Sequence, residues 1–280
     1  MSGAPLQSYL DKWLAAQPAQ RLAMPFIEAP AFAGHRALAA LEQEWIDAVY
    51  GIRELQVAQM KLHWWAEELA GAPASGGRHP LTQALFASPA AGHVEPGLWL
   101  APLEAAMAQL DAATPADFAE QRTRAAALHG ALARLETCWW YGADADPARA
   151  AAHAVVDHLL HATALLDAQR EHERLALPMA RLARHGLDRA ALAADSAARR
   201  AAVHEQLAEI DALRDAARSL HGPLSLFRGL QMRENERLLR RVRHAAEPLA
   251  RLKALRARAA TGSVFRAWSA AREWRRQGGA

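Results

Sequence analysis

The sequence predicts an all-α protein, and three observations support this prediction. Hydrophobic residues make up 52% of the 280-residue chain, which is enough for a sizeable core, and many of them are alanine, the strongest helix former. Valine, isoleucine and tyrosine, which favour strands, are scarce. No stretch alternates apolar and polar residues over the length of a strand. We therefore expect a helical bundle with short connections.

The first part of the chain should contain a short helix, a loop and one long helix. The short amphipathic helix is expected at residues 9–16, and the Pro- and Ala-rich residues 17–34 are expected to form the loop. Apolar residues then recur at helical spacing, so a single helix is predicted over residues 36–70, with these side chains on its buried face. The sequence GAPASGG at residues 71–77 should break the chain.

Capping signals mark the starts of two further helices. Thr114 and Pro115 suit the N-cap and the first turn of a helix that should run to an aromatic cluster at residues 139–141. Asp146 and Pro147 repeat this pattern at the start of the next helix, which should be the central one. The other helices are expected at residues 98–111, 188–220, 223–247, 248–259 and 263–276.

The chain is expected to be organised around residues 151–187, a long helix with an unusual face of His, Asp and Gln side chains. Pro178 cannot continue a helix and displaces the preceding residue from the α region. The long helix should therefore end there, and a short helix closed by Gly186 should follow. Positions i, i+3, i+7 and i+11 of one stripe hold His158, His161, Leu165 and Gln169. We expect this stripe to line a cavity.

Three carboxylates of the first long helix could bind a metal ion. Glu44, Asp47 and Glu54 lie close to one face of that helix. Mg²⁺ usually takes one or two carboxylates together with substrate oxygens, so these residues could hold Mg²⁺ and a phosphate. The alternative is that they are solvated or paired with arginine.

A second candidate metal site lies on the central helix. His153, Asp157 and His161 are spaced four apart and could present a row of ligands. A zinc site would also draw ligands from another element, and the sequence does not identify these. Histidines that are hydrogen-bonded inside a polar cavity are the alternative.

Several classes of protein are not expected. Cys138 is the single cysteine, which excludes an intramolecular disulfide and suits a reducing compartment. The amino terminus has no basic segment followed by an apolar run, so no signal peptide is predicted. No window of roughly eighteen residues is uninterruptedly apolar. Neither a Gly-x-Ser-x-Gly motif nor a Gly-rich phosphate loop occurs. We expect a cytoplasmic protein.

The net charge of +3 hides an asymmetry. Residues 221–280, a basic helical segment, contain 14 Arg and Lys against 4 Glu, a net charge of +10, so the rest of the chain carries −7. The arginines could be solvated, or they could contact an acidic membrane surface or protein partner. Trp268 and Trp274 could lie with neighbouring arginines at a lipid–water boundary, or pack on the bundle. Nucleic acid is not expected, because no recognition motif accompanies the charge.

Three stretches together resemble the squalene/phytoene synthase family, the head-to-head type of trans-isoprenyl diphosphate synthase. Residues 61–69, KLHWWAEEL, and the following His79-Pro80 resemble the family's Leu-x-Trp-Trp-x-x-Glu-Leu and His-Pro signature. Residues 174–178, RLALP, resemble its Arg-x-Tyr-Leu-Pro, and residues 184–187, RHGL, resemble the His-Gly that follows. The resemblance implies a single domain over residues 1–280, an isoprenoid-synthase-like helical bundle around a central cavity.

The resemblance also implies what catalysis would need. The family's enzymes hold Mg²⁺ between two aspartate-rich motifs, and the metal binds the diphosphate of farnesyl or geranylgeranyl diphosphate. Counting back from Arg174, the two aspartates of the second motif correspond to Leu165 and Gln169, and the preceding glutamine and asparagine correspond to His158 and His161. In the first motif, Asp47 fills one position, and its partner would be Tyr50 or Gly51.

The second aspartate motif is thus lost. We therefore predict that ordinary prenyl transfer does not occur, because the negative charge of a departing diphosphate must be neutralised as it builds. The sequence AALEQEWIDAVYG at residues 39–51 is closer to a branch similar to the mitochondrial complex I assembly factor, which has kept the fold without the synthase chemistry.

Three hypotheses about function follow. The first is a catalytically degenerate protein that binds an isoprenoid diphosphate or other lipid, or assembles with a partner. The others are an active Mg²⁺-dependent prenyl transferase and a ligand-free scaffold.

No catalytic residue is assigned, and no cofactor is predicted apart from Mg²⁺ in an active enzyme. Asp47 and Glu44 are the candidate metal ligands. The residues expected to line the cavity or bind its ligand are Glu44, Asp47, Glu54, Trp65, His158, His161, Leu165, Gln169 and Arg174.

Overall fold

A computed structural model describes residues 3–168, 175–257 and 263–278. Within these residues the secondary structure is helical and contains no strand, which confirms the all-α prediction. The α-helices are α1 Gly3–Ala16, α2 Ala33–Tyr50, α3 Leu55–Ser75, α4 Pro80–Phe86, α5 Pro96–Leu110, α6 Phe118–Tyr141, α7 Ala148–Ala164, α8 Met179–Arg184, α9 Ala197–Ala217, α10 Leu226–Val242, α11 Pro248–Arg256 and α12 Ser263–Arg276.

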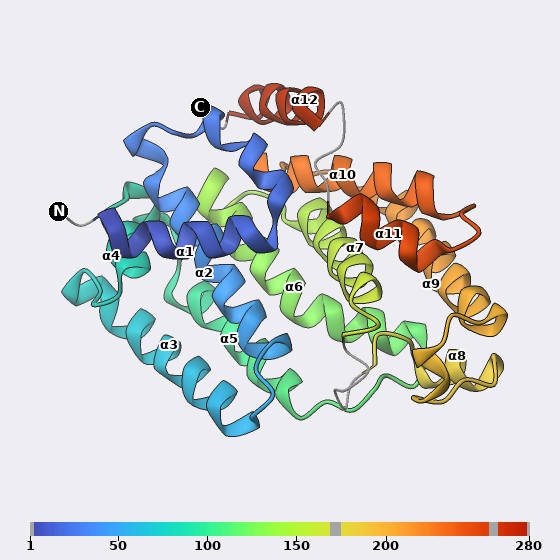
Figure 1. Ribbon diagram of the computed structural model, residues 1–280. Coiled ribbons are helices and arrows are strands. Elements are labelled where there is room, and N and C mark those ends of the chain that lie inside the picture. The colour runs from blue at the N-terminus through green and yellow to red at the C-terminus, as the bar shows by residue number, and fades with distance from the viewer. Residues whose placement is uncertain (1–2, 169–174, 258–262, 279–280) are drawn as a thin grey trace.

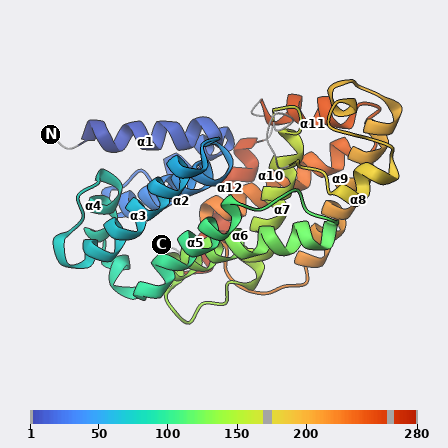
Figure 2. The ribbon, with the colours of Figure 1, turned by 90° about the horizontal axis from the view of Figure 1, so that it is seen from below.

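The two long helices α6 and α7 pack against each other in the middle of the bundle (Figure 1). One hydrophobic cluster joins helices α1 to α6 to the start of α10 and to α12. A second cluster joins α7, α8, α9 and α11 to the end of α10. Helix α1 lies across α2 in both views of the molecule (Figures 1 and 2). The helices that carry the candidate site, α2, α6, α7 and α10, therefore meet where the two clusters adjoin.

The predicted helix over residues 36–70 is in fact two helices. Helix α2 ends at Tyr50, Gly51 forms its C-cap, and α3 begins only at Leu55. The apolar periodicity continues across this break because Ile52 packs against the core from the connection itself. The predicted break at residues 71–77 lies too early, since α3 continues to Ser75 and ends at Gly76, which has a positive φ of 77°. The expected loop at residues 17–34 instead contains short 3₁₀ turns and the start of α2.

The helix predicted to start at Thr114 starts later, at Phe118. The Asp117 carboxylate caps it by accepting a hydrogen bond of 2.8 Å from the Glu120 amide. Thr114 has a different partner, because its hydroxyl accepts a hydrogen bond from the amide of Leu175. The Pro115 and Ala116 carbonyls accept hydrogen bonds from the first two amides of α8. This segment thus anchors the chain before α8 and is not available as a helix cap.

The central helix α7 is shorter than predicted. It ends at Ala164 with Leu165 as its C-cap, and a turn follows that buries Leu166 completely. Its start lies within one residue of the prediction, because the Asp146 carboxylate accepts a hydrogen bond of 2.9 Å from the Ala148 amide. Helix α8 follows Pro178 and is closed by Gly186, as predicted.

The carboxy-terminal helices agree with the predictions to different degrees. Helix α12 has the predicted bounds, and α11 starts at the predicted Pro248. Helices α9 and α10 are shorter than the predicted segments 188–220 and 223–247. Among the described helices, none combines the length and the apolar character needed to cross a membrane.

Candidate functional site

A polar cavity lies between α2, α6, α7 and α10, closed on one side by the end of α1 and the turn after it. The side chains leave a free volume of about 90 Å³. Its lining residues are Trp13, Gln17, Gln20, Ala39, Glu42, Gln43, Ile46, His129, Leu132, Glu136, Asp157, His158, His161, Phe227, Arg228 and Gln231. The predicted His158 and His161 are therefore cavity residues.

An arginine and two glutamates form one wall of this cavity. The Arg228 guanidinium donates to Glu136 Oε2 from Nη2 at 2.5 Å and from Nε at 3.0 Å, and the Ser225 hydroxyl donates to the other carboxylate oxygen. Burial alone would lower the pKa of Arg228, but the adjacent Glu136 and Glu42 raise it overall. Burial, and then the charge of Glu136, hold the pKa of Glu42 well above its usual range. In this wall the Arg228 charge is matched by Glu136, and the raised pKa of Glu42 favours its neutral form.

The candidate metal ligands Glu44 and Asp47 are bound by the protein's own side chains. The Lys12 ammonium lies 2.5 Å from Glu44 Oε1 and 2.9 Å from Asp47 Oδ2. Lys61 lies 2.7 Å from Glu44 Oε2, and Gln43 donates to Asp47 Oδ1 at 2.7 Å. Burial would raise the pKa of Glu44, but the hydrogen bonds from Lys12 and Lys61 lower it below the usual value. All four carboxylate oxygens therefore already have a donor.

The remaining cavity carboxylate, on α7, also has partners. Asp157 Oδ1 accepts hydrogen bonds from the amides of Gln231 at 2.8 Å and Asn235 at 3.1 Å. These amides come from α10, so the contact ties α7 to α10 across the cavity. Asp157 Oδ1 thus serves as a hydrogen-bond acceptor that holds the two helices together.

Burial lowers the pKa of two of the cavity histidines, His129 and His161. His161 Nδ1 lies 2.6 Å from Arg256 Nη2, and since arginine can only donate, the imidazole accepts. Burial, and then the charge of Arg256, lower the pKa of His161 to about 4. His158 stacks on His129 with a ring-centroid distance of 4.0 Å, and Tyr50 lies 4.8 Å from His158. Burial holds the pKa of His129 well below its usual value. In their neutral form, His129 and His161 offer no charge to attract a diphosphate.

The predicted zinc row does not form a site. His153 is buried, its pKa is lowered to about 4 by burial, and it is not among the lining residues of the cavity. Throughout the part of the chain that the structure describes, no three His, Cys, Asp or Glu side chains are placed to hold a metal ion. The donor set around Glu44 and Asp47 does not fit Mg²⁺ either, because its oxygens face two ammonium groups.

The other predicted site residues lie in different surroundings. Glu54 is exposed just before α3. Trp65 is buried in the core, edge-on to His79 at 4.7 Å. Leu165 is 39% exposed and is not among the lining residues of this cavity, because α7 ends before it. Gln169 and Arg174 lie outside the described residues.

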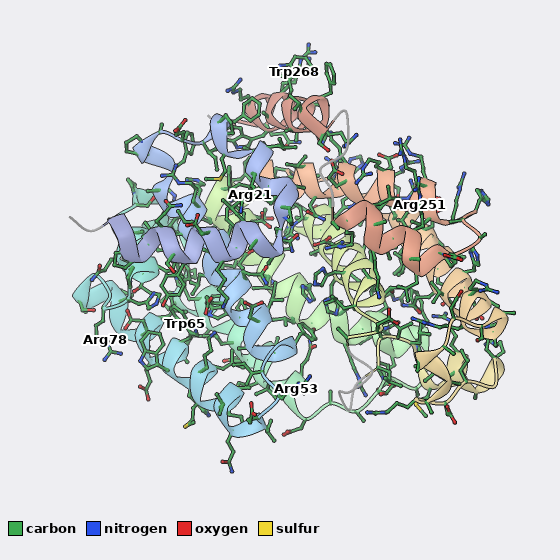
Figure 3. The ribbon with its side chains drawn as sticks, viewed as in Figure 1. Arg21, Arg53, Trp65, Arg78, Arg251 and Trp268 are labelled. Carbon is green, nitrogen blue, oxygen red and sulfur yellow. The ribbon has the colours of Figure 1, made fainter. Side chains whose placement is uncertain are left out.

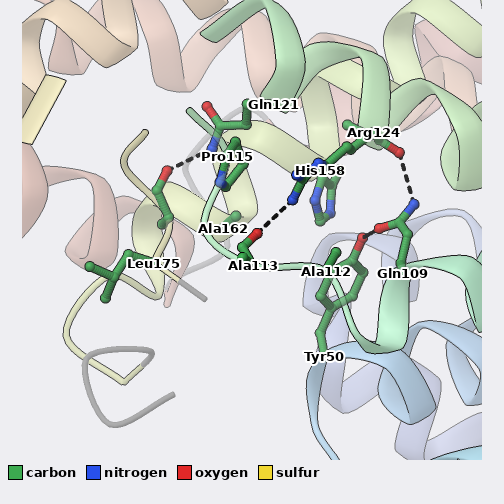
Figure 4. Close-up of a pocket in the computed structure, with 12 residues that line it drawn as sticks. Tyr50, Gln109, Ala112, Ala113, Pro115, Gln121, Arg124, His158, Ala162 and Leu175 are labelled. Atoms are coloured by element: carbon green, nitrogen blue, oxygen red, sulfur yellow. Dashed lines mark hydrogen bonds between the residues drawn. The ribbon is translucent and has the colours of Figure 1, made fainter. Parts of the chain in front are cut away.

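A second cavity adjoins the first at His158. It also has a free volume of about 90 Å³ and is lined mainly by small apolar side chains. Its polar edge is hydrogen-bonded: the Tyr50 hydroxyl donates to Gln109, and Gln109 donates to the Arg124 carbonyl, both at 2.8 Å (Figure 4). Gln121 closes another side by donating to the Ala176 carbonyl at 2.7 Å.

A third cavity of about 220 Å³ adjoins the first at His161. It lies between the end of α1, α10 and α11, and Arg256 and Arg237 are among its lining residues. The first and second cavities thus share His158, and the first and third share Gln17, His161 and Gln231. Each is smaller than the roughly 300–1,000 Å³ of typical small-molecule pockets.

Sequence reasoning missed Glu136 and Arg228, which line the central cavity, and Lys12, which pairs with Glu44 beside it. Glu136 has a visible signal, since a charged residue stands next to the apolar stretch from Cys138 to Tyr141 on α6. Arg228 and Lys12 have no such signal, because their partners lie 92 and 32 residues away in the chain.

Comparisons with known proteins identify the fold. No family model matches the sequence, and no curated protein matches it. Among solved structures, squalene synthase HpnC from Alicyclobacillus acidocaldarius is 16% identical, with 98% of this chain and 95% of that chain covered and a TM-score of 0.58. A dehydrosqualene synthase in complex with a ligand is 12% identical, with 90% and 98% covered and a TM-score of 0.63. The chain therefore has the all-α isoprenoid-synthase fold of squalene synthases, as predicted. Its likeness to the assembly-factor branch stays a prediction.

Proposed function

We propose that this chain is a non-catalytic protein on the squalene-synthase fold, which acts by binding a partner or a lipid. One observation carries the proposal: every carboxylate oxygen of Glu44 and Asp47 already accepts a hydrogen bond from Lys12, Lys61 or Gln43. Magnesium-dependent chemistry needs such oxygens free to bind the ion and its diphosphate.

The electrostatics of the cavity support the same proposal. Arg228 is matched by Glu136, and Lys12 and Lys61 are matched by Glu44 and Asp47, so the cations have no surplus charge to offer an anion. His161 is neutral because its pKa is about 4. A leaving diphosphate would therefore find no free metal ligand at Glu44 and Asp47, and Arg256, the cation beside His161, donates to that ring.

The volumes favour an assembly role over a lipid carrier. Filling all three cavities with one prenyl chain would require side chains at their boundaries to move, among them His158 and His161. The lipid-binding alternative is supported only by the alignment of the cavities. Mass spectrometry of an organic extract of the purified protein distinguishes the two roles, since a carrier would yield a stoichiometric prenyl lipid.

The direct test is incubation with farnesyl or geranylgeranyl diphosphate and Mg²⁺, with measurement of released pyrophosphate. We expect no release above the protein-free background, while an active squalene synthase assayed in parallel releases it. Pyrophosphate together with a C30 or C40 hydrocarbon would establish the alternative, an active transferase with a shifted metal site at Glu44 and Asp47.

A further inference from the structure

The outer face of α12 exposes three large apolar side chains. Val264 is 67% exposed, Phe265 76% and Trp268 53%. Figure 3 shows Trp268 on the side of α12 that points away from the bundle. Single exposed apolar residues are normal on protein surfaces, but three within five positions of one helix form a patch that marks a contact site.

The opposite face of the same helix fixes α12 to the bundle. Ala267, Ala270 and Ala271 are buried and allow a close approach to α10. Trp274 is 2% exposed and lies edge-on to Phe32 and Trp140. Of the two tryptophans considered for a membrane contact, Trp274 therefore belongs to the core, and only Trp268 is available.

Arginines border this patch. Arg272, Arg275 and Arg276 are exposed, and the Arg272 guanidinium lies 5.5 Å from the centre of the Trp268 ring. The single acidic residue of α12, Glu273, is turned toward Arg149 and Arg233, at 3.1 and 2.5 Å. The exposed side of α12 is thus apolar and cationic, without an opposing carboxylate of its own helix.

We propose that α12 docks the protein on a membrane surface rich in anionic phospholipid. Val264, Phe265 and Trp268 enter the boundary between headgroups and acyl chains, and Arg272, Arg275 and Arg276 contact lipid phosphates. A second copy of this chain fits the face less well, because a symmetric contact would bring two rows of arginines together. The inference does not depend on the proposed function, since the patch lies on the surface and the cavity side chains take no part in it.

A stripe on α3 provides a matched control. Val57, Met60 and Trp64 are 45%, 63% and 39% exposed, which is a comparable apolar surface. The nearby exposed charges include Glu54 and Glu67, so this stripe is not bordered by a row of arginines.

The test is co-flotation of the full chain with vesicles of phosphatidylcholine alone, or with about one third phosphatidylglycerol. We expect binding to the anionic vesicles only, and a loss of binding as salt shortens the range of the attraction. The double variant Phe265→Ser/Trp268→Ser should lower the bound fraction about tenfold or more. The triple variant Arg272→Gln/Arg275→Gln/Arg276→Gln should lower it at low salt. The control Met60→Ser/Trp64→Ser should bind like the wild type.

A second readout separates docking from misfolding. Brominated lipid should quench part of the tryptophan fluorescence in the wild type, and Trp268→Phe should remove this quenching while the protein still floats. Equal binding to neutral and anionic vesicles, or loss of binding only in the α3 control, would overturn the proposal. So would a dimer in sedimentation that Phe265→Ser/Trp268→Ser disperses, because the occupant of the patch would then be a second copy.

Discussion

The central cavity and the outer face of α12 use charge in opposite ways. In the cavity, the Arg228 guanidinium lies 2.5 Å from the Glu136 carboxylate, and beside the cavity Lys12 lies 2.5 Å from Glu44. On α12, Arg272 and its neighbours are exposed beside apolar side chains that are also exposed. A buried charge pair is costly to break, whereas a contiguous exposed apolar patch marks a contact site. The same kind of side chain is thus paired in the interior and exposed on α12.

The largest effect should come from breaking the cavity cluster. Arg228→Ala leaves Glu136 buried without its cation, and removal of one partner of a buried pair costs about 3–5 kcal/mol. Urea unfolding followed by circular dichroism measures this loss. Arg276→Ala, which removes an exposed arginine of α12, is the matched control and should change the free energy of unfolding by less than about 0.5 kcal/mol. Equal losses in the two variants would mean that the cavity cluster is not structural.

Acid should destabilise the protein through its buried histidines. The pKa values of His153 and His161 are about 4 in the folded state and 6.5 without burial. Below pH 6.5 the unfolded chain therefore binds protons that the folded protein does not. Stability should fall from pH 6.5 toward pH 4, by at most about 1.4 kcal/mol per pH unit for each histidine.

The matched pair His153→Gln and His63→Gln checks this pH dependence. His153 is buried and His63 is exposed. Urea unfolding at several values between pH 7 and pH 5 should show a flatter dependence only for His153→Gln. If the free energy of unfolding depended on pH equally in the wild type, His153→Gln and His63→Gln, the acid sensitivity would belong to other groups.

Much of the fold could be predicted, because helical periodicity is a local property of the sequence. Helix α12 has the predicted bounds, and the region of α7 was recognised from its His-rich face. The end of α7 was wrong by more than a turn, since the buried Leu166 depends on packing by other helices. The ion pairs were not predictable, because the partners of Glu44 and Glu136 come from other helices: Lys12 from α1 and Arg228 from α10. Such pairings depend on the arrangement of helices in space.

Removing the lysines that pair with Glu44 and Asp47 should show whether these carboxylates can bind a metal ion. In Lys12→Met/Lys61→Met, the Glu44 and Asp47 carboxylates lose their ammonium partners and could bind a cation. Mg²⁺ should then raise the melting temperature of the variant but not of the wild type. At ten times its Kd the ion would stabilise the variant by about 1.4 kcal/mol. Stabilisation of the wild type by Mg²⁺ would show that the lysines do not block the site.

The smallest expected effect concerns Glu42. Burial and Glu136 raise its pKa, so the folded protein keeps this proton while the unfolded chain loses it as the pH rises through 4.5. The contribution of Glu42 to stability should therefore decline with rising pH, and Glu42→Gln should remove that decline. Near pH 5 the variant should match the wild type within about 0.5 kcal/mol, because a glutamine replaces a neutral acid. A large loss at that pH would mean that Glu42 is ionised in the cavity.

The burial of Trp274 has a consequence for how the protein would sit on a bilayer. Helix α12 packs against Phe32, Trp140 and α10, so it is fixed to the bundle and is not a separate, flexibly tethered segment. Attachment through the outer face of α12 would therefore fix the orientation of the whole bundle relative to the membrane. Helix α3 lies at the far side of the molecule in Figure 1. Helix α3 would then lie away from the lipid surface.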